Sequence, residues 1–338
     1  MARRTGQRLF EGFRPALDLG RRLWASRTRQ VLLPIAALLV AGWLIHRELK
    51  GWSWALFLQA IRTTPASALW AAAILTPLSY ACLAITEWYA LQSLGHRQDW
   101  KRAGGVAFAA YALSNSLGFS WATGTAARLR YYSRWGLSAR EVAAVAMLAG
   151  TAVSLAGVVT AGAALMISPR IFSQALHSTT WMVQGAGLVL MTPAALWFVF
   201  LRRQRLPDHG PLGPQTHAGR AFALAGGVAD WVLSGAALYV LLPGAAFSGL
   251  AGFLAVFVLG SLVSAATGVP GGVGVFEAIV IGLSTLLAKA HETATALILY
   301  RVIYSLAPLI ITACVLAARR LIRHAKAATR PAESASDG

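Results

Sequence analysis

Charged residues, cysteines and acidic side chains are all scarce in this chain of 338 residues. Charged residues make up 12%, against about 25% in a soluble globular domain, so there is too little charge to cover a water-exposed surface. Cys82 and Cys314 lie far apart in apolar runs without CxxC or Cys/His spacing, which argues against a metal site and a disulfide framework. The seven histidines also lack zinc spacing, so we expect no metal and no cofactor.

The excess of basic residues gives a net charge of +18. Such an excess is found in nucleic-acid-binding proteins. Here, however, the charges sit in short loops between apolar stretches, as topology signals do. We therefore expect no nucleic-acid partner, and we expect contacts with anionic lipid headgroups at the cytoplasmic face.

Apolar stretches dominate the rest of the chain, with 57% hydrophobic residues. A membrane helix needs about 20 mostly apolar residues, so the sequence predicts an all-α, polytopic transmembrane helix bundle of about six to eight spans. The clearest candidate spans are Val31–Ile45, Ser67–Leu91, Val142–Ile167, Trp181–Leu201, Ala221–Leu242 and Thr293–Ala318. Val106–Trp121, Leu250–Thr267 and Val275–Ala288 are less regular, and the aromatic segment Gly51–Ile61 is expected along the outer interface.

Loop charges give an orientation with both termini in the cytoplasm. Eight arginines occupy residues 1–30, a basic cytoplasmic segment with no cleavage site of small residues after the first apolar run, so we expect that run to be retained. Further basic clusters fall around residues 97–102, 202–220 and 319–330, whereas Ser168–Thr180 carries only Arg170 and is expected outside. The transmembrane domain is placed at 31–318, followed by a basic and then disordered cytoplasmic tail at 319–338.

One basic loop does not fit a topology in which every apolar stretch crosses the membrane completely. Arg128, Arg130, Arg134 and Arg140 follow Val106–Trp121 and would face outward if that stretch crossed fully. A re-entrant hairpin that breaks near Ser120–Thr125 removes the conflict. The triplet Ala122-Thr123-Gly124 recurs as Ala266-Thr267-Gly268, at an offset of 266 − 122 = 144 residues. The match is either a coincidence or the trace of two inverted repeats with broken helices in corresponding positions.

The most distinctive local sequence is Pro270-Gly271-Gly272-Val273-Gly274-Val275-Phe276-Glu277. Proline and three glycines forbid a regular helix there. No Gly-Lys-Ser/Thr follows, so it is not a P-loop, and no ATP motif occurs elsewhere. The simplest interpretation is a tight turn with Glu277 in the first turn of the next helix.

This octapeptide resembles the signature of the lysylphosphatidylglycerol synthase transmembrane region, a flippase-like family of inner-membrane domains. The segments Ala112–Ser116, Thr123–Arg128 and Trp135–Ser138 resemble its first block, and Tyr300-Arg301 with Tyr304 and Pro308 resembles its closing motif. The resemblance implies a stand-alone flippase-like domain of the bacterial inner membrane. The aminoacyl-transferring domain of the synthases is missing, so we expect no enzyme activity and no catalytic residues.

Polar residues inside the apolar stretches are the candidates for a lipid-binding groove. Arg301 lies eight residues into the last span, where a charge is costly, and is expected to pair with Glu277, Asp230 or Glu87. The candidate groove residues are Asn115, Arg128, Asp230, Gly271, Gly272, Gly274, Glu277, Arg301 and Tyr304.

Several of these polar residues also have a purely structural interpretation. Asn115 could form an interhelical hydrogen bond, and Arg128 could be a topology charge instead of a phosphate-binding fork. Glu87 is interpreted as an interfacial charge, and Tyr131 and Tyr132 as interface anchors. For the whole chain, the leading hypothesis is translocation of a phospholipid or polyprenyl-type lipid without ATP hydrolysis. The alternatives are an accessory membrane subunit of a lipid pathway and, least supported, a membrane transferase. The oligomeric state stays open, with a homodimer among the states allowed.

Overall fold

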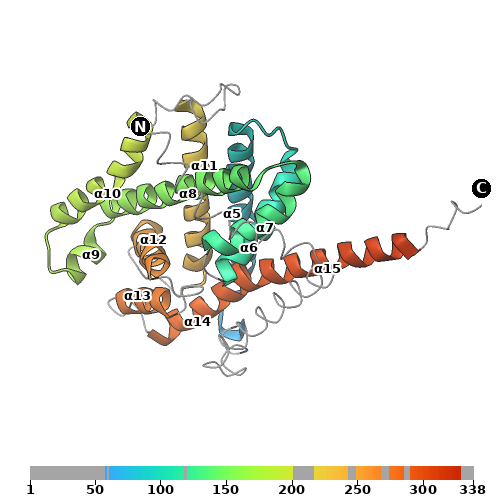
Figure 1. Cartoon of the computed structure of the whole chain (residues 1–338). Helices are drawn as coiled ribbons and strands as arrows, with labels where there is room; N and C mark the ends of the chain where they lie inside the picture. Colours follow the sequence, from blue (N-terminus) through green and yellow to red (C-terminus); the bar gives the residue numbers. More distant parts are fainter. Residues whose placement is uncertain are drawn as a thin grey trace, which may run out of the picture. The chain divides into compact units, whose positions relative to one another are not determined.

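The computed structural model describes residues 58, 61–117, 120–200, 217–242, 249–267, 274–284 and 290–328 (Figure 1). Within these ranges the chain is helical and contains no strand, which confirms the all-α prediction. The predicted span Val31–Ile45 and nearly all of Gly51–Ile61 lie outside them. So do Gly271 and Gly272.

The described helices keep the order and nearly the bounds of the predicted apolar stretches. They are α5 (Ala66–Ser93), α6 (Trp100–Leu117), α7 (Ser120–Tyr132), α8 (Ala139–Ile167), α9 (Arg170–Ala175), α10 (Thr180–Phe200), α11 (His217–Tyr239), α12 (Leu250–Ala266), α13 (Val275–Ser284), α14 (Ala290–Tyr300) and α15 (Ala307–Ala328). A 3₁₀ turn (Ser133–Trp135) follows α7, and a π-helical turn (Arg301–Leu306) joins α14 to α15. Five stretches are long and apolar enough to cross a membrane: α5, α8, α10, α11 and Glu292–Ala318.

The centre of the bundle is formed by α5, α8 and α11, and α8 runs across the other two (Figure 1). Small residues let these helices approach closely. A Cβ atom on Gly227 of α11 would lie 2.6 Å from the Ala156 side chain of α8, and Gly157 accommodates the indole of Trp231. The Trp231 Nε1–H donates to the Val153 carbonyl at 2.8 Å, so this junction also has a polar anchor. Close contact through small residues is the usual solution in membrane helix pairs.

Helices α6 and α7 form the hairpin that the basic loop predicted. Ala103 and Val106 at the start of α6 pack with Tyr132 at the end of α7, so the two helices run antiparallel. Helix α6 ends at Leu117 and α7 begins at Ser120, so Ser120–Thr125 forms the first turns of α7, and the residues between the two helices lie outside the described ranges. Gly124 lets α7 pack closely against α6, because a Cβ atom at this position would lie 2.5 Å from the Ser114 hydroxyl.

The predicted Gly-Leu-Ser motif starts α8. Gly136 has φ of 87°, a left-handed conformation that glycine adopts without strain, and Leu137 is buried. Ser138 and Glu141 form a reciprocal capping box at the helix N-terminus. Glu141 also lies 3.2 Å from Nε2 of His96, so the α5–α6 loop and the start of α8 occupy the same end of the bundle.

Helices α12 and α13 form a second packed pair, with Gly260 against Phe276 and Ile279. The triplet echo does not relate the two pairs. Thr123 and Gly124 lie inside α7, after the first break, whereas Ala266 ends α12, before the second. The triplets therefore occupy different structural positions, and the repeat argument based on them fails.

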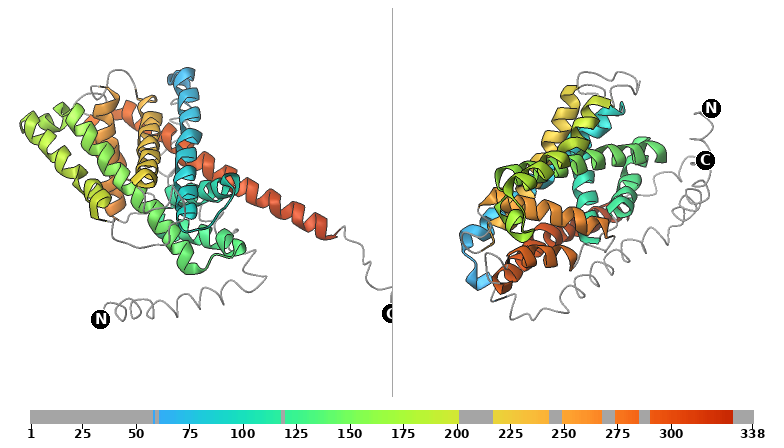
Figure 2. Two further views of the ribbon diagram at one scale, coloured as in Figure 1. Left: turned by 90° about the horizontal axis from the view of Figure 1, so that it is seen from above. Right: turned by 90° about the vertical axis from the view of Figure 1, so that its left-hand side faces the viewer.

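The last helix extends further than the sequence predicted. We placed the end of the transmembrane domain at Ala318, but α15 continues to Ala328 and projects away from the rest of the bundle (Figure 2). Ala, Leu, Arg and Lys dominate this extension and are strong helix formers, which accounts for the continued helix.

Candidate functional site

A buried ion pair joins the first hairpin to α5. Arg128 of α7 donates from Nε and Nη2 to the two carboxylate oxygens of Glu87, each at 2.7 Å. The Tyr132 hydroxyl donates to Glu87 at 2.8 Å, and the Arg128 guanidinium lies over the Tyr111 ring at 4.9 Å. The side chains of Arg128 and Glu87 are 6% and 0% exposed, so this pair is sealed from solvent.

Three sequence interpretations are corrected by this cluster. Glu87 is not an interfacial charge, because its side chain is fully buried. Tyr132 is not an interface anchor for the same reason. The Arg128 fork, expected to hold a lipid phosphate, is directed at Glu87. The sequence interpretation failed because Glu87 and Arg128 are 41 residues apart, and only the hairpin brings them together.

The second ion pair joins Glu277 of α13 to Arg301 of the π-helical turn. This confirms the expected carboxylate partner of Arg301. The other Glu277 oxygen accepts the Gly274 N–H at 2.8 Å, so Glu277 also caps its own helix, as the simplest interpretation predicted. The side chains of Arg301 and Glu277 are 17% and 18% exposed, in contrast to the sealed first pair.

Asp230 of α11 is the third acidic residue of the site, and it is buried. It accepts a hydrogen bond from the Ser79 hydroxyl of α5, and the same hydroxyl lies 2.8 Å from that of Tyr304. The Tyr80 hydroxyl donates a hydrogen bond to the Tyr304 carbonyl at 3.1 Å and accepts one from the Asn115 side-chain amide at 3.4 Å. Asn115 therefore lies within a network that joins α5, α6, α11 and the π-helical turn.

The three acidic sites are connected through the π-helical turn and α5. Arg301 and Tyr304 are three residues apart on the π-helical turn, so the second ion pair adjoins the Asp230 network. Ser79 and Glu87 are eight residues apart on α5, about 12 Å along the axis, so that network leads toward the first pair. π-Helical turns are often found at functional sites, and this one carries two of the polar groups.

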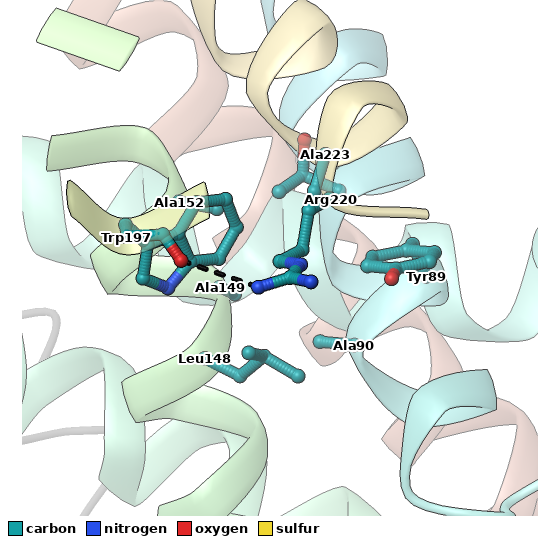
Figure 3. A pocket seen from close by; sticks show the side chains of 9 residues that line it. Tyr89, Ala90, Leu148, Ala149, Ala152, Trp197, Arg220 and Ala223 are labelled. Carbon is teal, nitrogen blue, oxygen red and sulfur yellow. Dashed lines mark hydrogen bonds between the residues drawn. The ribbon is translucent and has the colours of Figure 1, made fainter. Parts of the chain in front are cut away.

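Arg220 is a buried cation that the sequence did not single out (Figure 3). It was counted as a loop charge, but only 2% of it is exposed. Nη1 donates to the Trp197 and Phe198 carbonyls at 3.2 and 3.3 Å, near the end of α10, where backbone carbonyls lack helical partners. The adjoining cavity, lined by Tyr89 and Thr86 among others, has a volume of about 10 Å³, enough for a single water molecule and too small for a headgroup.

Elsewhere in the described ranges, no group of three or more His, Cys, Asp or Glu side chains could hold a metal ion. The positions of the long apolar helices, the buried ion pairs and the helical hairpin define the class as a multi-pass α-helical membrane protein.

The particular family follows from comparison with known proteins. The family described as "Lysylphosphatidylglycerol synthase TM region" matches residues 31–312, and the chain belongs to it. The chain is similar to "Uncharacterized protein slr0712" of Synechocystis, with 27% identity over 87% of this chain and 92% of that protein.

Two further relatives frame the functional question. The "Inner membrane protein YbhN" of Escherichia coli is 27% identical over 75% of this chain and 80% of its own length. The "Phosphatidylglycerol lysyltransferase" of Bacillus subtilis is 22% identical over 83% of this chain but only 33% of its own length. The similarity to that enzyme thus covers a third of it.

Proposed function

We propose that this protein moves a lipid headgroup across a bacterial inner membrane without hydrolysing ATP itself. The observation that carries the proposal is the set of three polar sites inside the bundle, namely the Glu277–Arg301 pair, Asp230 with its hydroxyl partners, and the Glu87–Arg128 pair. A headgroup must cross about 30 Å of hydrocarbon, and polar side chains inside a bundle lower the cost of that passage. Intramembrane ionisable residues are functional candidates by default.

The Glu277–Arg301 pair is the proposed contact for the headgroup. Its partial exposure lets a lipid reach it, whereas the sealed Glu87–Arg128 pair is closed to ligands in this conformation. Arg301 offers donors to a phosphate, and Glu277 offers an acceptor to an ammonium group. Such a pair suits zwitterionic or anionic phospholipids.

The inner membrane and the cytoplasmic termini are part of this proposal. Its support is the similarity to an inner membrane protein of Escherichia coli and the arginine-rich loops brought to one end of the bundle.

Reconstitution in liposomes tests the proposal. A headgroup-labelled phosphatidylglycerol or phosphatidylethanolamine, read by a membrane-impermeant quencher, should equilibrate across the membrane faster with the wild type than in empty vesicles. Glu277→Gln keeps the side chain's size and removes its charge, and Arg301→Gln removes the cation. Each should slow crossing about tenfold to a hundredfold, the effect of losing one charged hydrogen bond of roughly 1.5–3 kcal/mol.

The matched control is Arg134→Gln, which alters an exposed arginine in the turn after α7 and should leave the rate unchanged. If the wild type fails to accelerate any lipid of the panel, the accessory-subunit hypothesis replaces this one. If Glu277→Gln moves lipid as fast as the wild type, Glu277 acts only as the cap of α13.

A further inference from the structure

Asp230 differs from Glu87 and Glu277 because it has no ion-pair partner among the described residues. Glu87 is paired with Arg128 and Glu277 with Arg301. Among the described residues, Asp230 has Ser79 as its hydrogen-bond donor, and only 6% of the residue is exposed. A carboxylate held in such surroundings without a counter-ion costs several kcal/mol more than the neutral acid.

The nearest cations lie beyond the tyrosines that surround Asp230. Arg301 interacts with Tyr300 and Arg128 with Tyr111, and each arginine is paired with a glutamate. Ser79, Tyr80 and Cys82 face it from α5, and Tyr111 from α6. Tyr300 and Tyr304 face it from the C-terminal helices.

The other helices packed against α11 carry their charged residues away from Asp230. Helix α12 contains no ionisable residue, and those of α8 are confined to Arg140 and Glu141 at its start. Helix α14 has His291 and Glu292 in its first turn, nine and eight residues before Tyr300. Arg220, on α11 itself, lies ten residues earlier, about 15 Å along the axis. The surroundings of Asp230 therefore consist of hydroxyl groups and one thiol.

Hydrogen bonds define a short relay between Tyr304 and Asp230. The Ser79 hydroxyl donates to ionised Asp230, and it lies 2.8 Å from the Tyr304 hydroxyl, where either oxygen can be the donor. Tyr304 lies on the π-helical turn next to the Glu277–Arg301 pair. A rearrangement at that pair would thus reach Asp230 through two hydroxyl groups.

We propose that Asp230 binds an exchangeable proton, and that lipid movement by this protein is coupled to proton movement through it. The coupling rests on the proposed lipid-translocating function. In the closed bundle described here, Asp230 holds the proton as a neutral acid. When water reaches the site, the O–H bond breaks, the proton passes to water and the carboxylate stays behind. A proton is the cation that fits, because a metal ion needs several converging oxygen ligands and a headgroup needs open space.

The first arm of the test needs no lipid transport. Infrared spectra of the full-length protein at neutral pH should contain the C=O stretch of a protonated carboxylic acid. This band should disappear in Asp230→Asn, which keeps the side chain's size, and persist in Asp99→Asn, which alters an exposed loop carboxylate. Spectra that are identical for the wild type and Asp230→Asn would show an ionised Asp230 and overturn the proposal.

The second arm measures coupling. For one proton per lipid, a gradient of one pH unit across the vesicle membrane should shift the steady-state distribution of labelled phosphatidylglycerol by a factor of about ten. Asp230→Asn should abolish that shift. Wild-type crossing that ignores the gradient refutes the coupling. A wild type that retains the infrared band but moves no lipid refutes the proposed function and still places the proton on Asp230.

Discussion

Arg128 and Glu87 meet through two hydrogen bonds of 2.7 Å, although they lie 41 residues apart in the sequence. The contact fastens the α6–α7 hairpin to α5, and Tyr132 adds a third hydrogen bond to the same carboxylate. Because both side chains are almost completely buried, neither has water as an alternative partner. The ion pair therefore holds the hairpin in place, and removal of either side chain would leave the charge of the other buried without a partner.

We expect Arg128→Ala to lower the free energy of unfolding by about 3–5 kcal/mol, the usual cost of leaving one partner of a buried ion pair behind. The double variant Glu87→Leu/Arg128→Met should recover much of this loss, since it removes both charges at similar volume. Thermal unfolding in detergent, followed by fluorescence, measures the effect. Arg134→Ala, on the exposed turn after α7, is the matched control. An Arg128→Ala protein as stable as this control contradicts the interpretation.

The helical elements of this fold were predictable because their signal is local. Runs of apolar residues and the arginines between them located the ends of α5, α8, α10 and α11 to within four residues. The first hairpin was also predicted from charge, because a full crossing would place four arginines outside, against the usual bias; the side that they face stays a prediction. The extension of α15 to Ala328 was missed, since a basic, polar tail resembles a disordered one in composition.

The candidate site was only partly predictable because its contacts are long-range. The Arg301–Glu277 pair could be inferred, since a deep arginine requires a carboxylate and few carboxylates exist. Glu87 and Arg220 were misjudged because a charge near a helix end looks the same in sequence whether it reaches water or turns inward. The network of Ser79, Asp230 and Tyr304 depends on three separate helical segments, whose packing no local pattern encodes.

Helices α8 and α10 approach so closely at Gly162 and Gly187 that neither tolerates a side chain. A Cβ on Gly162 would lie 2.5 Å from the Gly187 carbonyl oxygen, a backbone atom that cannot move aside alone. We expect Gly162→Ala to lower the free energy of unfolding by about 1–3 kcal/mol through overpacking. Gly185→Ala, on the same helix as Gly187 but with no atom within 4 Å, should be neutral or stabilising. Equal unfolding midpoints for the two variants would show that the helices simply move apart.

The turn before α13 requires glycine at position 274 for conformational reasons. Gly274 has φ of 86°, which costs a residue with a side chain about 1–2 kcal/mol. Gly274→Ala should therefore be destabilising although a Cβ there meets no atom within 4 Å. Gly282→Ala, inside α13 and equally uncrowded, should instead gain about 0.5–1 kcal/mol. Circular dichroism melting curves of the two variants should shift in opposite directions, and a common direction would contradict the argument.

The end of the bundle that carries the arginine-rich loops should face the cytoplasm. The contact of His96 with Glu141 holds the α5–α6 loop and the turn before α8 at one end, and arginines on both sides of that turn favour retention inside. After Cys82 and Cys314 are replaced by Ser, a single cysteine at the exposed Ser133 should resist a membrane-impermeant maleimide in intact cells and react once the cells are broken. A cysteine at the exposed His177, in the loop between α9 and α10, should react from outside and serves as the control. Labelling of Ser133→Cys in intact cells, with His177→Cys protected, would invert the topology and place the Glu87–Arg128 pair near the outer face.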